Sequence, residues 1–167
     1  SPTSGINYLG LRNMNVGTTT VTYTATFTGG IVKTCSFTVL VKETMPPNIL
    51  CPADKDVNTD PGKCYKTGPV SLGTPVVSDN CGIASITNNA PSVYQKGVNL
   101  VTWTVTDKSG NTRTCVQRVT VYDAEKPVIT CPANVIVNAG TGPNCNVTQL
   151  TLPQPVFTDN CGVVTLK

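Results

Sequence analysis

Cysteine is the residue type in this 167-residue chain with the clearest capacity for chemistry. The chain has eight cysteines and no histidine. The absence of histidine excludes Ser-His-Asp and Cys-His catalysis and the usual mixed Cys/His zinc sites. The cysteines form no CxxC pairs and stand at Cys35, Cys51, Cys64, Cys81, Cys115, Cys131, Cys145 and Cys161. This regular placement predicts disulfide bonds formed in an oxidising compartment.

The cysteine spacing repeats with a period of about 80 residues. Three pairs are 80 residues apart and a fourth is 81 apart: Cys35 and Cys115, Cys51 and Cys131, Cys81 and Cys161, and then Cys64 and Cys145. The stretch from Gly17 to Pro52 matches Gly97 to Pro132 at the same offset, with Tyr23 at the position of Trp103. We therefore expect the back half of one module over residues 1–44, a complete module over 45–124, and the front half of a third over 125–167.

Alternating side chains within each repeat predict strands. Val101, Trp103 and Val105 alternate with threonines, which is the period of a half-buried strand, and Asp107–Asn111 has turn composition. Further strands are expected at 19–28, 33–42, 51–58, around Val70 and Leu72, and at 83–87, with a loop over 75–82. The predicted core of the complete module is Val57, Val70, Leu72, Ile83, Ile86, Val101, Trp103, Val105, Val119 and Val121, and Tyr23 is expected to pack inward as Trp103 does.

Six or seven short strands in 80 residues, separated by frequent turns, predict an all-β fold of tandem immunoglobulin-like β-sandwich modules. Two sequence patterns carry a family resemblance. They are TxTDxxGNxxxC, from Thr104 to Cys115, and PVxxDNCG, from Pro75 to Gly82 and again from Pro155 to Gly162. In these patterns the chain resembles the hyalin repeat (HYR) domain, in the four-cysteine form arrayed in large secreted, adhesin-like proteins of Bacteroidota. The resemblance implies an extracellular module of adhesion or surface architecture.

The resemblance also implies one disulfide pairing. HYR domains with only two cysteines keep the positions of Cys51 and Cys115, which favours a bond between these two. Cys64 would then pair with Cys81, and Cys145 with Cys161, while Cys35 and Cys131 have no equivalent partner within the chain. The alternative pairing joins Cys81 to Cys115 and Cys51 to Cys64.

Four acidic residues near loops are weak calcium candidates: Asp79, Asp107, Asp123 and Glu125. Calcium prefers six to eight oxygen ligands, and carboxylates at a junction between modules could supply some of them. The interpretation we favour is that Asp79 and Asp107 are turn residues bonded to nearby amides. No cofactor is therefore expected.

Composition narrows the function further. Charged residues make up 13% of the chain and the net charge is +3, so a nucleic-acid partner is not expected, and no run of 18 apolar residues predicts a membrane span. We expect a non-enzymatic structural segment of a long cell-surface protein, in which copies of the module in series form a stalk or filament. Its partners would be further copies of the module and perhaps other chains of a filament. Alternatives are a module that binds a glycan or protein through the loops near Asp79 and Asn111, and an accessory domain of a secreted enzyme.

Overall fold

The fold is all-β, as predicted. A computed structural model describes residues 13–139, 147 and 150–162, and the described residues form strands and no helix. None of the described segments is therefore a helix that could cross a membrane. The chain divides into two compact units. The first holds the described residues up to Ile49, Val77–Ile86 and Thr104–Thr114, and the second holds Leu50–Val76, Thr87–Trp103 and the described residues from Cys115 onward.

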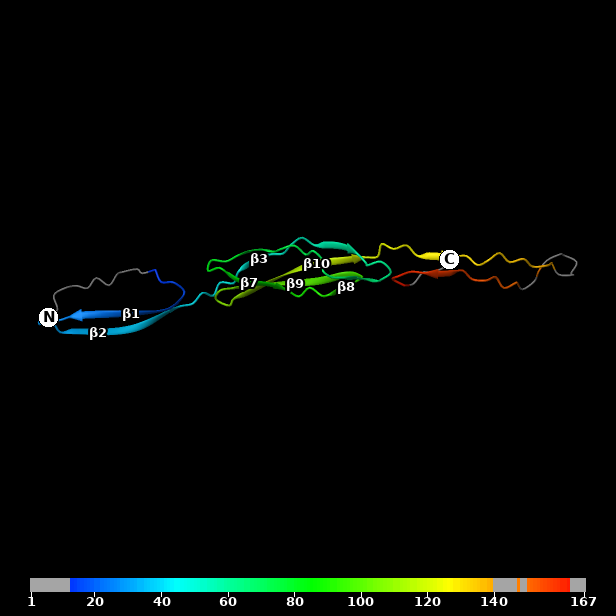
Figure 1. Cartoon of the computed structure of the whole chain (residues 1–167). Coiled ribbons are helices and arrows are strands. Elements are labelled where there is room, and N and C mark those ends of the chain that lie inside the picture. Colours follow the sequence, from blue (N-terminus) through cyan, green and yellow to red (C-terminus); the bar gives the residue numbers. More distant parts are fainter. Residues whose placement is uncertain (1–12, 140–146, 148–149, 163–167) are drawn as a thin grey trace. The chain divides into compact units, whose positions relative to one another are not determined.

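The expected complete module contains the largest sheet, an immunoglobulin-like arrangement of four strands in the order β4-β10-β9-β7. The long strands β9 and β10 lie side by side at its centre (Figure 1). Strand β4 runs parallel to β10, with Val57 opposite Val121. The four strands are β4 (Lys55–Asn58), β7 (Ile83–Asn88), β9 (Gly97–Asp107) and β10 (Thr112–Tyr122). Two small sheets complete the module, one of β3 (Asn48–Leu50) with β6 (Val76–Ser78) and one of β5 (Tyr65–Thr67) with β8 (Val93–Gln95).

The core follows the alternation in β9 and β10. Val101, Trp103 and Val105 are buried, whereas the threonines between them are partly exposed. Val119 and Val121 are buried on β10. Burying one such side chain contributes about 1.5–3 kcal/mol. The alternating valines and threonines therefore place the apolar face of the central hairpin inward, as the sequence predicts.

Three expectations about this module were wrong. Val70 and Leu72 lie outside any strand, because Pro69 has no N–H to donate and the strand β5 ends before it at Thr67. Residues 76–78, expected in a loop, form the short strand β6. Ile86 is 41% exposed, since β7 lies at the edge of its sheet. Leu72 is nevertheless buried.

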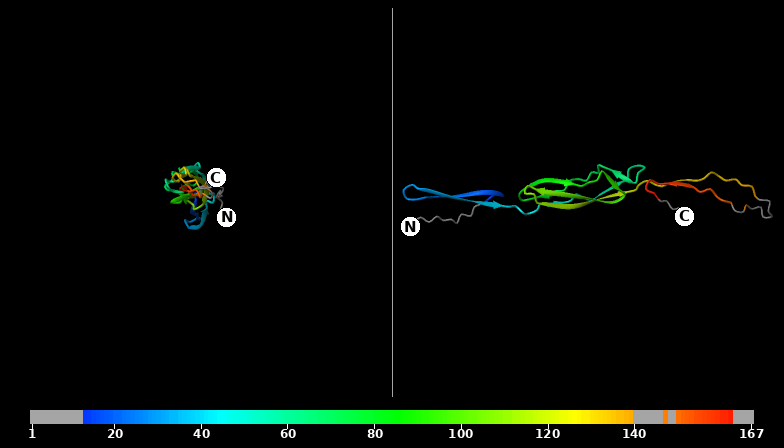
Figure 2. Two further views of the ribbon diagram at one scale, coloured as in Figure 1. Left: turned by 90° about the vertical axis from the view of Figure 1, so that its right-hand side faces the viewer. Right: turned by 90° about the horizontal axis from the view of Figure 1, so that it is seen from below.

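The first repeat is represented by a hairpin equivalent to β9 and β10. Strand β1 (Gly17–Thr26) pairs antiparallel with β2 (Val32–Val41) along its whole length (blue in Figure 2). The turn keeps its geometry although Phe27 replaces the aspartate. The Phe27 N–H donates to the Ile31 carbonyl at 2.8 Å, and the equivalent bond from Asp107 to Asn111 is 3.0 Å. Local backbone hydrogen bonding therefore survives divergence of the side chain.

Tyr23 does not pack into a core as predicted. It is 36% exposed, whereas Trp103 is 6% exposed. The physical reason is that the sheet of Tyr23 has only two strands, β1 and β2. Its ring instead lies 5.8 Å from that of Phe37, centre to centre.

In the third repeat, β11 (Val128–Thr130) pairs antiparallel with β12 (Val156–Thr158). Each of these strands is 80 residues after its counterpart in the β3–β6 pair. The repeat seen in the sequence is thus present in the strand pairing as well.

Candidate functional site

One disulfide closes the central module on itself. Cys51 follows β3 directly, Cys115 lies on β10, and the bond between them spans a Cα–Cα distance of 5.8 Å. This is the pair that the resemblance implied. The alternative pairing, in which Cys115 joins Cys81 and Cys51 joins Cys64, is wrong. The bond ties the entry strand of the module to its last long strand.

The second disulfide joins two different repeats. Cys64 is bonded to Cys161, 97 residues later, with 4.6 Å between their Cα atoms. The expected Cys64–Cys81 and Cys145–Cys161 pairs are therefore wrong. The reason lies in the neighbouring contact, because the Asn160 side chain donates to the Lys63 carbonyl at 2.8 Å and holds Cys161 beside Cys64. Cys161 occupies the position in its repeat that Cys81 occupies in the central one.

The loop that carries Cys64 is held by the Asp60 carboxylate. This group accepts hydrogen bonds from the Lys66 ammonium at 2.6 Å, from the Thr67 amide at 2.8 Å, and from the Thr67 hydroxyl. The Lys66 bond, followed by those from Thr67, holds the pKa of Asp60 well below its ordinary value. The Gly62 amide also donates to Glu125 at 2.7 Å. The loop is thus anchored on both sides of Cys64.

The two copies of the Asp-Asn-Cys-Gly turn have matching local geometry. The amides of Cys81 and Cys161 each donate to the aspartate two residues earlier, at 2.8 Å. The glycines that follow them, Gly82 and Gly162, have φ values of 95° and 86°, a region that disfavours other residues. Yet Cys161 is bonded, whereas Cys81 is a half-buried free thiol.

The other cysteines have different outcomes. Cys35 and Cys131 are exposed and unpaired among the described residues. Cys145 lies outside the described residues. The absence of a partner for Cys35 and Cys131 within the chain agrees with the expectation drawn from the resemblance.

A network of acidic groups surrounds Cys81. The Asp107 carboxylate accepts bonds from the amides of Ser109 and Asn111, both at 2.8 Å, and from the Asn111 side chain, also at 2.8 Å. The same side chain donates to Glu43 at 2.6 Å. Burial alone would raise the pKa of Asp107, but the hydrogen bonds, led by that of the Asn111 side chain, lower it below its ordinary value. Burial, and then the negative charges of Glu43, Asp79 and Asp107, raise the pKa of the Cys81 thiol.

The structure places the four calcium candidates in two groups. Asp79 and Asp107 belong to the first unit and accept hydrogen bonds from their own turns. Asp123 and Glu125 belong to the second, where Asp123 lies 3.5 Å from the Lys96 ammonium and Glu125 accepts from the Gly62 amide. Among the described residues, no three acids or cysteines cluster as metal ligands. The hydrogen bonds of Asp79 and Asp107 are those expected of turn residues.

Two buried polar residues were missed by sequence reasoning. Gln117 accepts from the Trp103 indole N–H at 3.0 Å and donates to the carbonyls of Ala53 at 2.6 Å and Leu72 at 2.9 Å. A buried tryptophan usually needs an acceptor for its N–H, which could have indicated Gln117 on the facing strand. Tyr94 is also buried, and burial raises its pKa.

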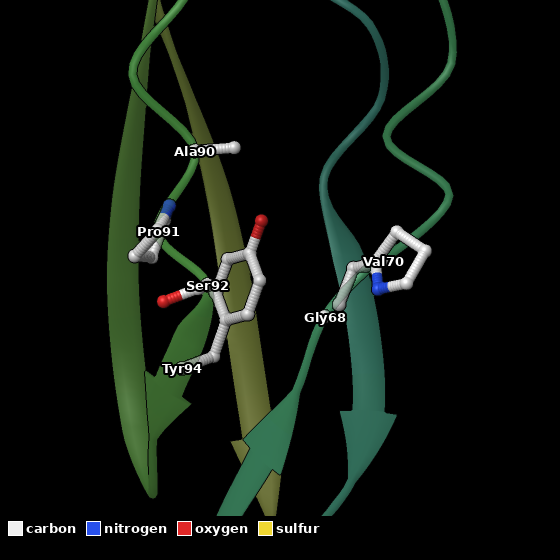
Figure 3. A pocket seen from close by; sticks show the side chains of 7 residues that line it. Gly68, Val70, Ala90, Pro91, Ser92 and Tyr94 are labelled. Atoms are coloured by element: carbon white, nitrogen blue, oxygen red, sulfur yellow. The ribbon is translucent and has the colours of Figure 1, made fainter.

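A cavity of about 390 Å³ lies beside Tyr94. Figure 3 shows the Tyr94 ring between the Ala90–Ser92 and Gly68–Val70 segments, which are joined by a 2.8 Å bond from the Gly68 amide to the Ser92 carbonyl. Its lining is mostly apolar and carries no charged side chain. Binding sites usually add a few converging polar groups to such a lining. The cavity therefore offers less specific chemistry than the cysteine sites.

Comparison with known proteins places these features in a family. The HYR domain matches residues 42–121. Hyalin of Lytechinus variegatus is 35% identical over 170 residues, covering 90% of this chain and 30% of that protein. Hyalin of Strongylocentrotus purpuratus is 32% identical, covering 87% of this chain and 12% of that protein.

A third relative has a different domain composition. The Sushi, von Willebrand factor type A, EGF and pentraxin domain-containing protein 1 of Rattus norvegicus is 29% identical over 80% of this chain and 4% of its own length. The chain thus spans less than a third of each of these relatives. No solved structure matches it. The family match coincides with the strands from β3 to β10 and with the Cys51–Cys115 bond, and the chain therefore contains a HYR domain over residues 42–121.

Proposed function

We propose that the chain is a load-bearing, non-enzymatic segment of an extracellular adhesion protein, built from four-cysteine HYR modules in series. The module boundaries in this proposal are 1–44, 45–124 and 125–167. The observation that carries it is the Cys64–Cys161 bond, because a bond between consecutive repeats serves a tandem array and has no use in an isolated module. Disulfide bonds also favour an oxidising location outside the cell.

The array would act as a stalk or filament at the cell surface, and its immediate partners would be further copies of the module. The relatives support a module within a much longer chain, since this chain covers only 30% of one hyalin and 4% of the rat protein. The curated relatives are animal proteins, whereas the cysteine pattern resembles proteins of Bacteroidota. An origin in that group is a separate part of the proposal.

The mechanism follows from the covalent path of the chain under tension. A pull on the two ends passes from Cys64 directly to Cys161, so the residues between them carry no load until that bond breaks. Fully extended chain spans about 3.5 Å per residue. The bond therefore hides about 340 Å of extension, from a separation of 97 residues.

Single-molecule pulling on the oxidised chain tests this proposal. Adding a reductant should lengthen the unfolded chain by about 340 Å. A Cys64→Ser chain, which keeps only the Cys51–Cys115 bond across 64 residues, should gain about 220 Å. If the unsubstituted chain also gains only about 220 Å, or gains nothing, the load-bearing bond is absent and the proposal fails.

A further inference from the structure

Cys81 has the same local setting as a cysteine that is already bonded. Its turn, its amide bond to Asp79 and its following glycine match those of Cys161. The asparagine before each cysteine also lies near the sulfur, with Nδ2–Sγ distances of 3.4 Å for Asn80 and 3.7 Å for Asn160. The partner of Cys161 is a cysteine of the preceding repeat, Cys64.

The contacts beside the bonded cysteine show what Cys81 lacks. Asn160 donates to the Lys63 carbonyl next to Cys64, whereas the exposed Asn80 side chain contacts only the neighbouring sulfur. The surroundings of Cys81 are negative, through Glu43, Asp79 and Asp107. The Cys64 loop brings the exposed, positively charged Lys63. Charge and hydrogen bonding both suit a loop of this kind as the partner of Cys81.

Resting on the function proposed above, we propose that Cys81 is the acceptor of a disulfide from the Cys64-equivalent cysteine of a preceding copy of the module. Two thiols lose two protons and two electrons as the S–S bond forms. A small disulfide such as oxidised glutathione takes up both and is released as two thiols. The same reaction repeated along an array links every module to the next.

Such linkage gives the array a covalent short cut. Within each module, only the stretch from Cys64 to Cys81 lies between one bond and the next. Those 17 residues extend to about 60 Å, compared with about 280 Å for a full repeat of 80 residues. The array stays short under load even when a module unfolds.

A lengthened chain tests the bond directly. A second copy of residues 45–124 is inserted after residue 124 of the full chain, with Ser85→Thr in the inserted copy as a mass marker, since Ser85 is exposed on β7. After alkylation of free thiols and tryptic digestion without reductant, the peptide 64–66 should be linked to the marked peptide that contains Cys81. The unmarked Cys81 should be alkylated. In a control with Cys81→Ser in the inserted copy, that link should disappear.

The outcomes separate this inference from the proposed function. A link from Cys64 to the unmarked Cys81, or alkylation of both Cys81 residues, overturns the inference. If the same digest still contains the Cys64–Cys161 link, the proposed function keeps its support. If that link is missing as well, both fail.

A second measurement decides the matter if the lengthened chain does not form Cys51–Cys115 in both copies. The full chain with Cys161→Ser, and with serine at the three other unpaired positions, leaves Cys64 and Cys81 as thiols. The three positions are Cys35, Cys131 and Cys145. In a glutathione redox buffer this chain should form head-to-tail oligomers joined by Cys64–Cys81, in amounts that rise with protein concentration. Adding Cys81→Ser should stop the series at a Cys64–Cys64 dimer. A monomer with an internal Cys64–Cys81 bond overturns the inference.

Discussion

Replacing Cys161 by serine should release the third repeat from the Cys64 loop while leaving the central module folded. The bond closes a loop of 97 residues. Loop-closure entropy for that length gives a stabilisation of about 4.7 kcal/mol, or about three orders of magnitude in the docking equilibrium. The remaining contacts beside it are the bonds from Asn160 to Lys63 and Asp123, each contributing about 0.5–1.5 kcal/mol.

Hydrogen exchange followed by mass spectrometry measures the effect on each segment. In the Cys161→Ser chain, amides of β11 and β12 should exchange at least about ten times faster. Those of β9 and β10, which the Cys51–Cys115 bond still secures, should change by less than about threefold. Cys131→Ser is the matched control, since it removes an exposed, unpaired cysteine of the same repeat and should change neither. Unchanged β11 and β12, or equal acceleration in β9 and β10, would refute the reasoning.

Four further outcomes are expected. Gln117→Leu should cost about 3 kcal/mol in thermal unfolding, because it strands one buried N–H and two carbonyls, while Gln95→Leu on the surface should cost about 0.5 kcal/mol or less; equal losses would contradict the network. The Asp60 pKa is depressed, so its contribution is present above the ordinary value of 3.8 and lost as the pH falls below it; melting temperature should therefore fall less steeply from pH 4 downward in Asp60→Asn, and parallel curves would count against the Lys66 bond. Glu43→Gln should speed alkylation of Cys81 at neutral pH, since it removes a charge that raises the thiol pKa, whereas Asp56→Asn should not. Millimolar calcium should leave the melting temperature unchanged, because the candidate carboxylates already bond to amides; a rise of more than about 3 °C, or about 1 kcal/mol, would reopen a calcium site.

The sequence was sufficient for the fold because the dominant interactions are local and periodic. Valines at every second position of β9 give the strand, its inward face and the core together. The same period places Gln117 inward with Val119 and Val121, but a polar side chain is easily passed over when only apolar residues are counted. The strand expected around Val70 failed because Pro69 outweighs the alternation beside it.

The cysteine pairing shows where local sequence stops being informative. Cys81 and Cys161 have the same neighbours, so nothing near either one tells Cys64 which to join. The choice depends on which repeat brings its turn against the Lys63 carbonyl, and that is a long-range contact. A tandem repeat therefore hides the difference between bonds within a module and bonds between modules.

Disulfide mapping of the unmodified, oxidised chain tests the central claim most directly. Digestion without reductant should give one linked pair of peptides that contains Cys51 and Cys115 and another that contains Cys64 and Cys161. Cys81 should be recovered as an alkylated thiol. Recovery of Cys64 linked to Cys81 would contradict the account.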